Sequence, residues 1–152
     1  QDKFAPVFEK KVKHFGGTLQ GIVYLPDDKE RIKAAILEYR RQGAEIIIAS
    51  GGMSVDPDDV TPDAIRAAGA DVVSYGTPVL PGAMFMLAYL GDIPVLGMPA
   101  CGMYAKTTVF DLVFPRILAG ERLTKADIAV MGYGGLCVSC PTCSFPHCPF
   151  GK

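Results

Sequence analysis

Cysteines are the residues of this chain with the clearest potential for chemistry. Four of the five are gathered near the C-terminal end, while Cys101 stands alone. A disulfide framework in a secreted protein would spread its cysteines so that distant segments are joined, unlike the distribution here. Thiolates this close in sequence can instead converge on one metal ion or cluster. We therefore predict a local metal site whose ligands are Cys137, Cys140, Cys143 and Cys148.

The spacing of these four cysteines leaves two kinds of centre open. The Cys-x-x-Cys-x-x-Cys run is similar to the bacterial ferredoxin pattern, although the gap before the fourth cysteine is longer by one residue. Four thiolates, or three thiolates with His147, also suit a closed tetrahedral zinc site. A third interpretation is a set of free thiols that oxidise to disulfides. The sequence predicts an iron–sulfur cluster or zinc in the tail, with a slight preference for the cluster.

A second group of residues suited to chemistry follows the apolar run at residues 46–49. Gly51 and Gly52 let the backbone approach a ligand closely and present N–H groups to an anion, and Ser54 adds a hydroxyl. The combination suits a phosphate-bearing, nitrogen-rich ring compound. The alternative is a simple turn whose acids are solvated and cap the next helix. Three acids there could accept ligand N–H groups or bind magnesium, namely Asp56, Asp58 and Asp59.

Two further loops rich in proline and glycine leave predicted strands, at residues 78–82 and 97–102. The first leads into a predicted helix, where backbone donors could meet an anion. The second places Cys101 at a tight turn, either as a soft ligand or as a small packing residue. One such loop is weak evidence, but three at one edge of a parallel sheet describe a pocket.

The elements that must position these loops alternate along the chain. Apolar runs predict strands at residues 18–25, 46–49, 71–75 and 93–98. Helical periodicity predicts one helix from Phe4 to the stop at Gly16, one that ends before Gly43, and others at residues 61–68, 83–90 and 104–118. Pro115 should kink or divide the last of these. We predict an α/β fold, a three-layer α/β/α arrangement with a mostly parallel sheet.

The composition changes near the C-terminal end. From Gly132 onward the chain is rich in Gly, Cys, Pro and Phe and has no periodicity. We place the boundary near residues 125–131, which gives an α/β domain at 1–125 and a cysteine-rich tail at 126–152. Such a tail cannot form a hydrophobic core alone and needs a cross-link such as a bound metal or a disulfide.

The three loops together resemble the molybdopterin-binding domain family of molybdenum cofactor biosynthesis, of the MoeA and MogA type. The resemblance covers about residues 2–121, and the loop from Gly51 to Thr61 is its most specific piece. The family's usual first strand, with its Thr-Gly-x-Glu loop, has no counterpart, which suggests a fragment of a longer protein. The resemblance implies that molybdopterin binds to Gly51, Gly52, Ser54, Asp59 and Thr61, with Pro81, Gly82, Pro99 and Ala100 closing the pocket.

Two departures from the family pattern bear on the reaction. The family commonly has Pro-Gly-Lys-Pro in the second loop, but Ala83 stands in the place of the lysine. It commonly has Pro-Gly-Asn-Pro in the third loop, where this chain has Ala100 and Cys101 after the proline. A missing lysine removes a charge suited to molybdate or phosphate. Cofactor binding therefore carries over more safely than molybdenum insertion or adenylyl transfer.

The overall charge and hydropathy exclude several classes of partner. Fifteen Lys and Arg against sixteen Asp and Glu give a net charge of −1, without a basic run. Nothing therefore favours nucleic acid or an anionic membrane surface. The apolar stretches are shorter than the roughly 20 residues of a membrane span, and no signal-peptide pattern is present. We expect a soluble, cytoplasmic protein.

The functional prediction is a domain that binds molybdopterin or molybdenum cofactor during maturation or delivery to an enzyme. Its partners would be a molybdoenzyme or another cofactor-biosynthesis protein, and the resemblance suggests a homotrimer. One alternative is a magnesium-dependent adenylyl- or molybdenum-transferase that uses Asp58 or Asp59 on a transferring phosphate. Another is a regulatory scaffold that kept the fold and lost the ligand.

Overall fold

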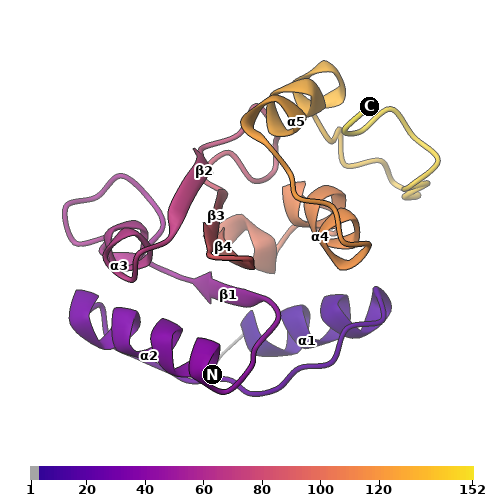
Figure 1. Ribbon diagram of the computed structural model, residues 1–152. Helices are drawn as coiled ribbons and strands as arrows, with labels where there is room; N and C mark the ends of the chain where they lie inside the picture. Colours follow the sequence, from indigo (N-terminus) through magenta and orange to yellow (C-terminus); the bar gives the residue numbers. More distant parts are fainter. Residues whose placement is uncertain (1–3) are drawn as a thin grey trace.

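A computed structural model describes residues 4–152 of the chain (Figure 1). Within these residues, no helix is both long and apolar enough to cross a bilayer. The helices are α1 (Phe4–His14), α2 (Lys29–Arg41), α3 (Thr61–Ala67), α4 (Val109–Leu118) and α5 (Lys125–Val130), with 3-10 turns η1 (Ala100–Met103) and η2 (Met131–Gly134). The strands are β1 (Ile47–Ser50), β2 (Asp71–Tyr75), β3 (Met86–Leu90) and β4 (Ile93–Met98).

The four strands form one mixed sheet in the order β1-β4-β3-β2. Only β1 and β4 are parallel, while β3 is antiparallel to both of its neighbours. The prediction of a mostly parallel sheet is therefore wrong, because residues 83–90 were expected to be helical and Met86–Leu90 is a strand. Every residue of β3 is buried, and a short, continuously apolar run has no periodicity that separates a buried strand from a helix. Gly91, with φ +66°, makes the tight hairpin turn into β4.

The strand predicted at residues 18–25 is also absent. These residues form no helix or strand, and the segment runs outside the sheet from α1 to α2 (Figure 1). Its apolar side chains are largely exposed, with Tyr24 at 68%. A strand is stabilised by pairing with a neighbour rather than by its own propensity, so the alternating pattern alone did not produce one.

The last predicted helix begins later than expected, because Thr108 caps it. The Thr108 side chain accepts a hydrogen bond from a backbone N–H in the first turn of α4. In return, the Asp111 carboxylate accepts a hydrogen bond from the Thr108 backbone N–H at 2.7 Å. Pro115 lies inside α4, but the helix continues to Leu118 and is not divided. The Asp111 carboxylate also forms a largely buried ion pair with the Lys11 ammonium of α1 at 2.6 Å. This ion pair joins the two helices.

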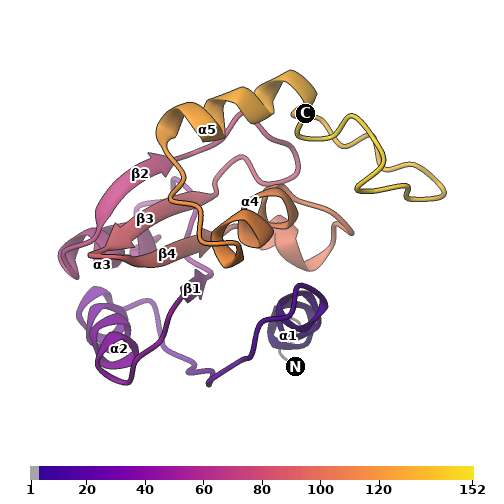
Figure 2. The ribbon, with the colours of Figure 1, turned by 45° about the vertical axis from the view of Figure 1, so that its right-hand side comes forward.

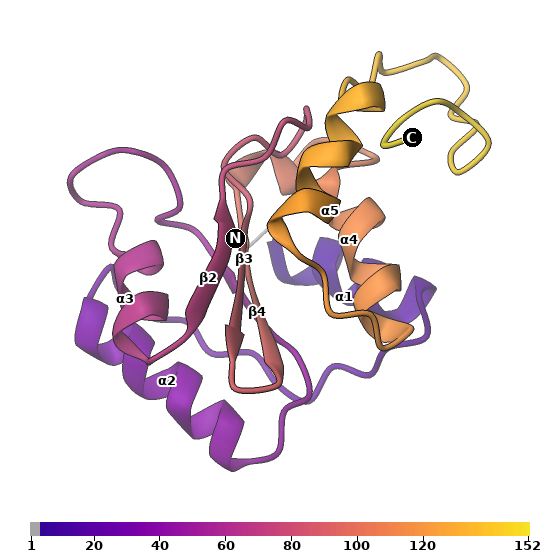
Figure 3. The same ribbon diagram turned by 45° about the horizontal axis from the view of Figure 1, so that its top comes forward.

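Helices cover both faces of the sheet (Figure 3): α2 and α3 lie on one face, and α1, α4 and α5 on the other. Each face has its own cluster of buried apolar side chains. The segment after residue 125 contributes to the second face, since Ile128, Met131 and Phe150 belong to the same cluster as Phe110. Residues 137–150 then form a loop that extends beyond α5 and returns (Figure 2).

Candidate functional site

The sheet topology brings the three glycine- and proline-rich loops to one edge. β1 and β4 are parallel and in register from Ile47 with Val95 to Ser50 with Met98, so the loops after them start side by side. β3 runs the other way, with Met86 opposite both Gly97 and Tyr75. The loop between β2 and β3 therefore reaches the same edge, even though the sheet is not parallel throughout.

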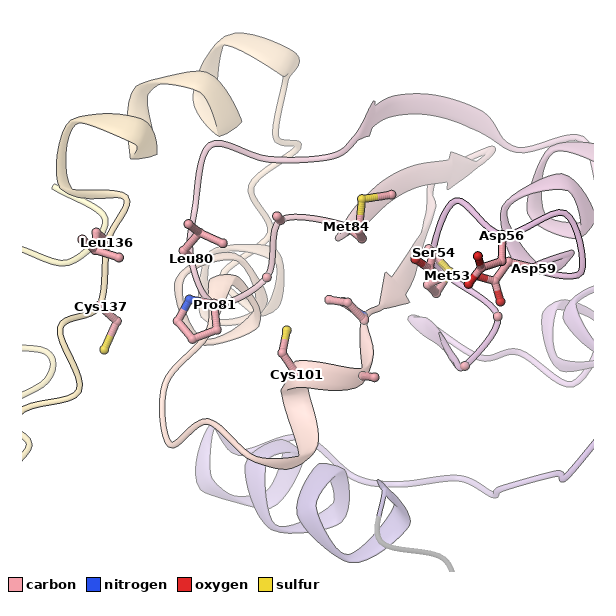
Figure 4. Close-up of a pocket in the computed structure, with 16 residues that line it drawn as sticks. Met53, Ser54, Asp56, Asp59, Leu80, Pro81, Met84, Cys101, Leu136 and Cys137 are labelled. Carbon is pink, nitrogen blue, oxygen red and sulfur yellow. The ribbon is translucent and has the colours of Figure 1, made fainter.

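These loops line an open cavity of about 720 Å³, within the range of roughly 300 to 1,000 Å³ usual for small-molecule sites. In Figure 4 the acidic side chains lie on one side, Leu80, Pro81, Leu136 and Cys137 lie on the other, and Cys101 lies between them. We call one group, Ser54, Asp56 and Asp59, the acidic end. We call the other the thiol end, formed by Leu80, Pro81, Cys101, Leu136 and Cys137. The remaining lining residues are Gly51, Gly52, Met53, Gly82, Ala83, Met84, Pro99 and Ala100.

The first loop is shaped by glycine and by a threonine beneath it. Gly51 and Gly52 both have positive φ, +88° and +57°, which a side chain would strain. Thr61 is only 4% exposed and donates its hydroxyl to the Gly51 carbonyl at 2.9 Å. A Cβ on Gly52 would lie 2.9 Å from the Thr61 hydroxyl oxygen. Thr61 thus supports the loop from below and does not line the cavity, unlike the other predicted binding residues.

Tyr75, at the end of β2, is a second support that the sequence analysis did not identify. Its hydroxyl lies 3.0 Å from the Met53 carbonyl and 2.9 Å from the Ser54 carbonyl, and can donate to either. Burial raises the pKa of the Tyr75 phenol, so the hydroxyl keeps its proton at neutral pH. The sequence offered one signal for this role. A tyrosine at the end of a strand has a hydroxyl that needs a hydrogen-bond partner when the residue is half-buried.

Two carboxylates line the acidic end of the cavity. Asp56 and Asp59 line the cavity, whereas Asp58, predicted as catalytic with Asp59, does not. Among the described residues that line the cavity, none is a lysine, arginine or histidine. Carboxylates of this kind accept N–H donors well or share a divalent cation. An anionic group in this cavity would depend on the backbone N–H groups of the glycine loops.

The second loop is fixed onto the start of α4. The Val109 amide donates to the Pro81 carbonyl at 3.1 Å, and a Cβ on Gly82 would overlap the Val109 side chain. Glycine is therefore required at position 82 by close packing as well as by its positive φ. The predicted closing residues Pro81 and Gly82 are held rigidly at the cavity wall.

A comparison of the sequence with known families decides the relationship. The family described as "probable molybdopterin binding domain" matches residues 1–119. The chain belongs to this family. The match covers the α/β part with all three loops and stops before the cysteine-rich segment.

Individual relatives agree with this molybdopterin-binding family. A molybdopterin molybdenumtransferase of Synechococcus elongatus is 23% identical over 104 residues, which is 68% of this chain and 26% of that protein. Molybdenum cofactor biosynthesis protein B of Bacillus anthracis is 28% identical over 116 residues, 73% of this chain and 66% of that protein. The chain thus spans about a quarter of the first relative and just under two thirds of the second.

A solved structure supports the same fold. The crystal structure of a molybdopterin biosynthesis protein from Mycobacterium abscessus matches with a TM-score of 0.55 and 16% identity. The match covers 79% of this chain and 87% of that chain. At this identity the likeness establishes the architecture of the molybdopterin-binding domain and not its activity.

The structure does not assemble the predicted metal centre in the tail. Within residues 4–152, no three His, Cys, Asp or Glu side chains are arranged so that they could hold a metal ion. Cys137 lines the cavity, Cys148 packs against the hydrophobic core, and Cys140 is exposed. Cys143 lies 3.9 Å from the Thr107 hydroxyl. Cys137 packs against the same hydrophobic core as Cys148, but among the described residues no three of these thiols converge on one point. The spacing in the sequence alone could not reveal this.

The cysteines also differ in acidity. A backbone N–H at Phe145 and the Thr107 hydroxyl lower the pKa of the exposed Cys143 thiol. Burial raises the pKa of the Cys101 thiol in the cavity. At neutral pH, Cys101 therefore favours the neutral thiol more than Cys143 does.

Proposed function

We propose that the cavity binds molybdopterin, or the molybdenum cofactor built on it, during cofactor maturation or delivery. The observation that carries the proposal is the convergence of three loops on one cavity in a domain of the molybdopterin-binding family. Eight of the nine residues implied as cofactor-binding line that cavity, and Thr61 supports the first loop.

The chemistry of the acidic end suits the pterin part of such a ligand. A pterin ring presents several N–H donors, and Asp56 and Asp59 offer carboxylate oxygens that can accept them. Ser54 adds a hydroxyl that can donate or accept. The phosphate would be held by backbone N–H groups, because no cationic side chain is among the described lining residues.

The test is binding of molybdopterin released anaerobically from a molybdoenzyme, measured by equilibrium dialysis against wild type and two variants. Asp59→Asn keeps the shape of the side chain but removes its charge, and should weaken binding by about tenfold or more. Asp58→Asn is the matched control, since Asp58 does not line the cavity. Equal affinity of wild type and Asp59→Asn would reject the assigned site.

A second candidate is magnesium-dependent transfer to the bound ligand. It is favoured by two carboxylates at one end of the cavity and by the name of the Synechococcus relative, a molybdenumtransferase. Asp59 would share the magnesium ion with a phosphate of the co-substrate. Turnover of ATP or molybdate that requires both magnesium and molybdopterin, and is lost in Asp59→Asn, would establish transfer in addition to binding.

Three further expectations belong to this proposal. The partner would be a molybdoenzyme or another protein of cofactor biosynthesis, and the assembly would be a trimer, which light scattering of the purified chain can measure. An iron–sulfur cluster or zinc in the tail stays a prediction from cysteine spacing. Anaerobic metal analysis tests it directly, with iron and acid-labile sulfide marking a cluster and stoichiometric zinc marking a structural site.

A further inference from the structure

We propose that the segment at residues 132–137, which we call the wall, places Leu136 and Cys137 on the ligand cavity and that Cys137, together with Cys101 of η1, makes a thiol-lined subsite for a soft, sulfur-bearing end of the ligand. This inference rests on the proposed function and assigns an orientation to the bound molecule. It gives the cysteine-rich segment a role in the site that differs from a closed metal centre.

Backbone pairing holds the wall in place. Leu80 and Leu136 form a parallel bridge, in which the Leu80 amide donates to the Gly135 carbonyl at 2.6 Å and the Cys137 amide donates to the Leu80 carbonyl at 2.8 Å. Leu80 is the residue just before Pro81 of the second loop. The pairing therefore fixes Cys137 at the cavity and does not leave it on a free chain.

Close packing of glycine reinforces the same contact. A Cβ on Gly135 would overlap the carbonyl oxygen of Pro78, and one on Gly132 would lie 3.0 Å from the Pro78 ring. The C-terminal end of the chain also holds this segment, since the Gly151 amide donates to the Gly134 carbonyl at 2.7 Å and the neighbouring Phe150 is 3% exposed. The wall is thus held by Pro78 and Leu80 of the second loop and by Gly151 near the C-terminus.

The two ends of the cavity differ in chemical hardness. Carboxylate and hydroxyl oxygens at the acidic end favour N–H donors and hard cations. The thiol end has two cysteine sulfurs on separate segments, Cys101 from η1 and Cys137 from the wall, among apolar side chains (Figure 4). Cysteine sulfur is a soft donor, which favours a soft metal ion such as one held by the sulfurs of the ligand. A ligand with a nitrogen-rich ring at one end and sulfur at the other fits in one direction only.

The experiment is alkylation of the full chain by a small maleimide, with mass spectrometry of each cysteine and an independent dialysis measurement of molybdopterin binding. Bound molybdopterin should slow the labelling of Cys101 and Cys137 by at least about tenfold. Cys140 and Cys143, which are exposed and do not line the cavity, should label at an unchanged rate. Binding without protection of Cys137 would overturn the inference while leaving the proposed function intact, whereas absence of binding would overturn both.

Two substitutions distinguish a role of Cys137 in the cavity wall from a role as a metal ligand. Cys137→Ser should weaken molybdopterin binding by at least about fivefold and leave the far-ultraviolet circular dichroism unchanged, because its amide still pairs with Leu80. Cys140→Ser should leave the affinity unchanged. Equal losses from the two variants, or resistance of all four tail cysteines to maleimide until a chelator is added, would show that they act as one metal centre and would overturn the inference.

Discussion

The acidic end and the thiol end of the cavity are built in different ways. The acidic end belongs to one loop that follows β1 and is tied down by Thr61, ten residues from its partner Gly51. The thiol end joins three segments that are far apart in the sequence, the second loop, η1 and the wall at residues 132–137. The acidic half is therefore held by contacts within residues 51–75, while the other half depends on contacts between segments far apart in the sequence.

The largest effect should come from the support beneath the thiol end. Asp111→Ala removes the carboxylate half of the capping box of α4 and leaves Lys11, whose side chain is 14% exposed, without its carboxylate partner. We expect a loss of about 3 kcal/mol in the free energy of unfolding, measured by urea denaturation. Asp63→Ala removes an exposed pair with Arg66 and a carboxylate in the first turn of α3 and should cost under about 1 kcal/mol. Similar losses in the two variants would contradict the role given to Asp111.

The support of the acidic end should matter less to stability but directly to binding. Thr61→Val keeps the shape of the side chain and removes the hydroxyl that donates to the Gly51 carbonyl. We expect a loss of about 1 to 2 kcal/mol in unfolding free energy and weaker molybdopterin binding. Thr142→Val, at an exposed position, should change neither quantity. Unchanged binding by Thr61→Val would mean that the loop holds its shape without this tether.

A smaller loss is expected from the second support of the same loop. Tyr75→Phe deletes the hydroxyl that contacts the Met53 and Ser54 carbonyls. The expected cost is about 1 kcal/mol, and Tyr133→Phe, at a residue that is 92% exposed, serves as the control. Additive losses in the Thr61→Val, Tyr75→Phe double variant would show that the two supports act independently.

The last prediction changes no residue and compares cysteine reactivity without ligand. Cys143 is exposed and its pKa is lowered, so it has a larger thiolate fraction at neutral pH than Cys101, whose pKa is raised by burial. Maleimide should therefore label Cys143 faster than Cys101. Both rates should rise with pH, and the rate at Cys143 should level off at a lower pH. A slower Cys143 would indicate that the tail is folded differently.

The same local-versus-distant contrast explains which sequence predictions were correct. The strand at residues 46–49, the glycine turn after it and the helix that starts at Thr61 are specified by neighbouring residues, and all three are present within one or two residues. Met86–Leu90 was assigned to the wrong element because burial on both faces removes the periodicity that separates strand from helix. The pairing of Leu80 with Leu136 could not be predicted from the sequence of either segment, because backbone hydrogen bonds do not require a particular side chain.

The pairing of Leu80 with Leu136 also sets an order in which the site can form. Contacts between near residues close at small entropic cost, whereas a contact across a long intervening chain requires most of the fold to be in place. The tether from Thr61 to Gly51 can therefore close early, and the Cys137 amide can find Leu80 only after the chain from β2 through α5 has folded. In a hydrogen-exchange experiment, the amide of Cys137 should open by local fluctuation well before the strands of the sheet do.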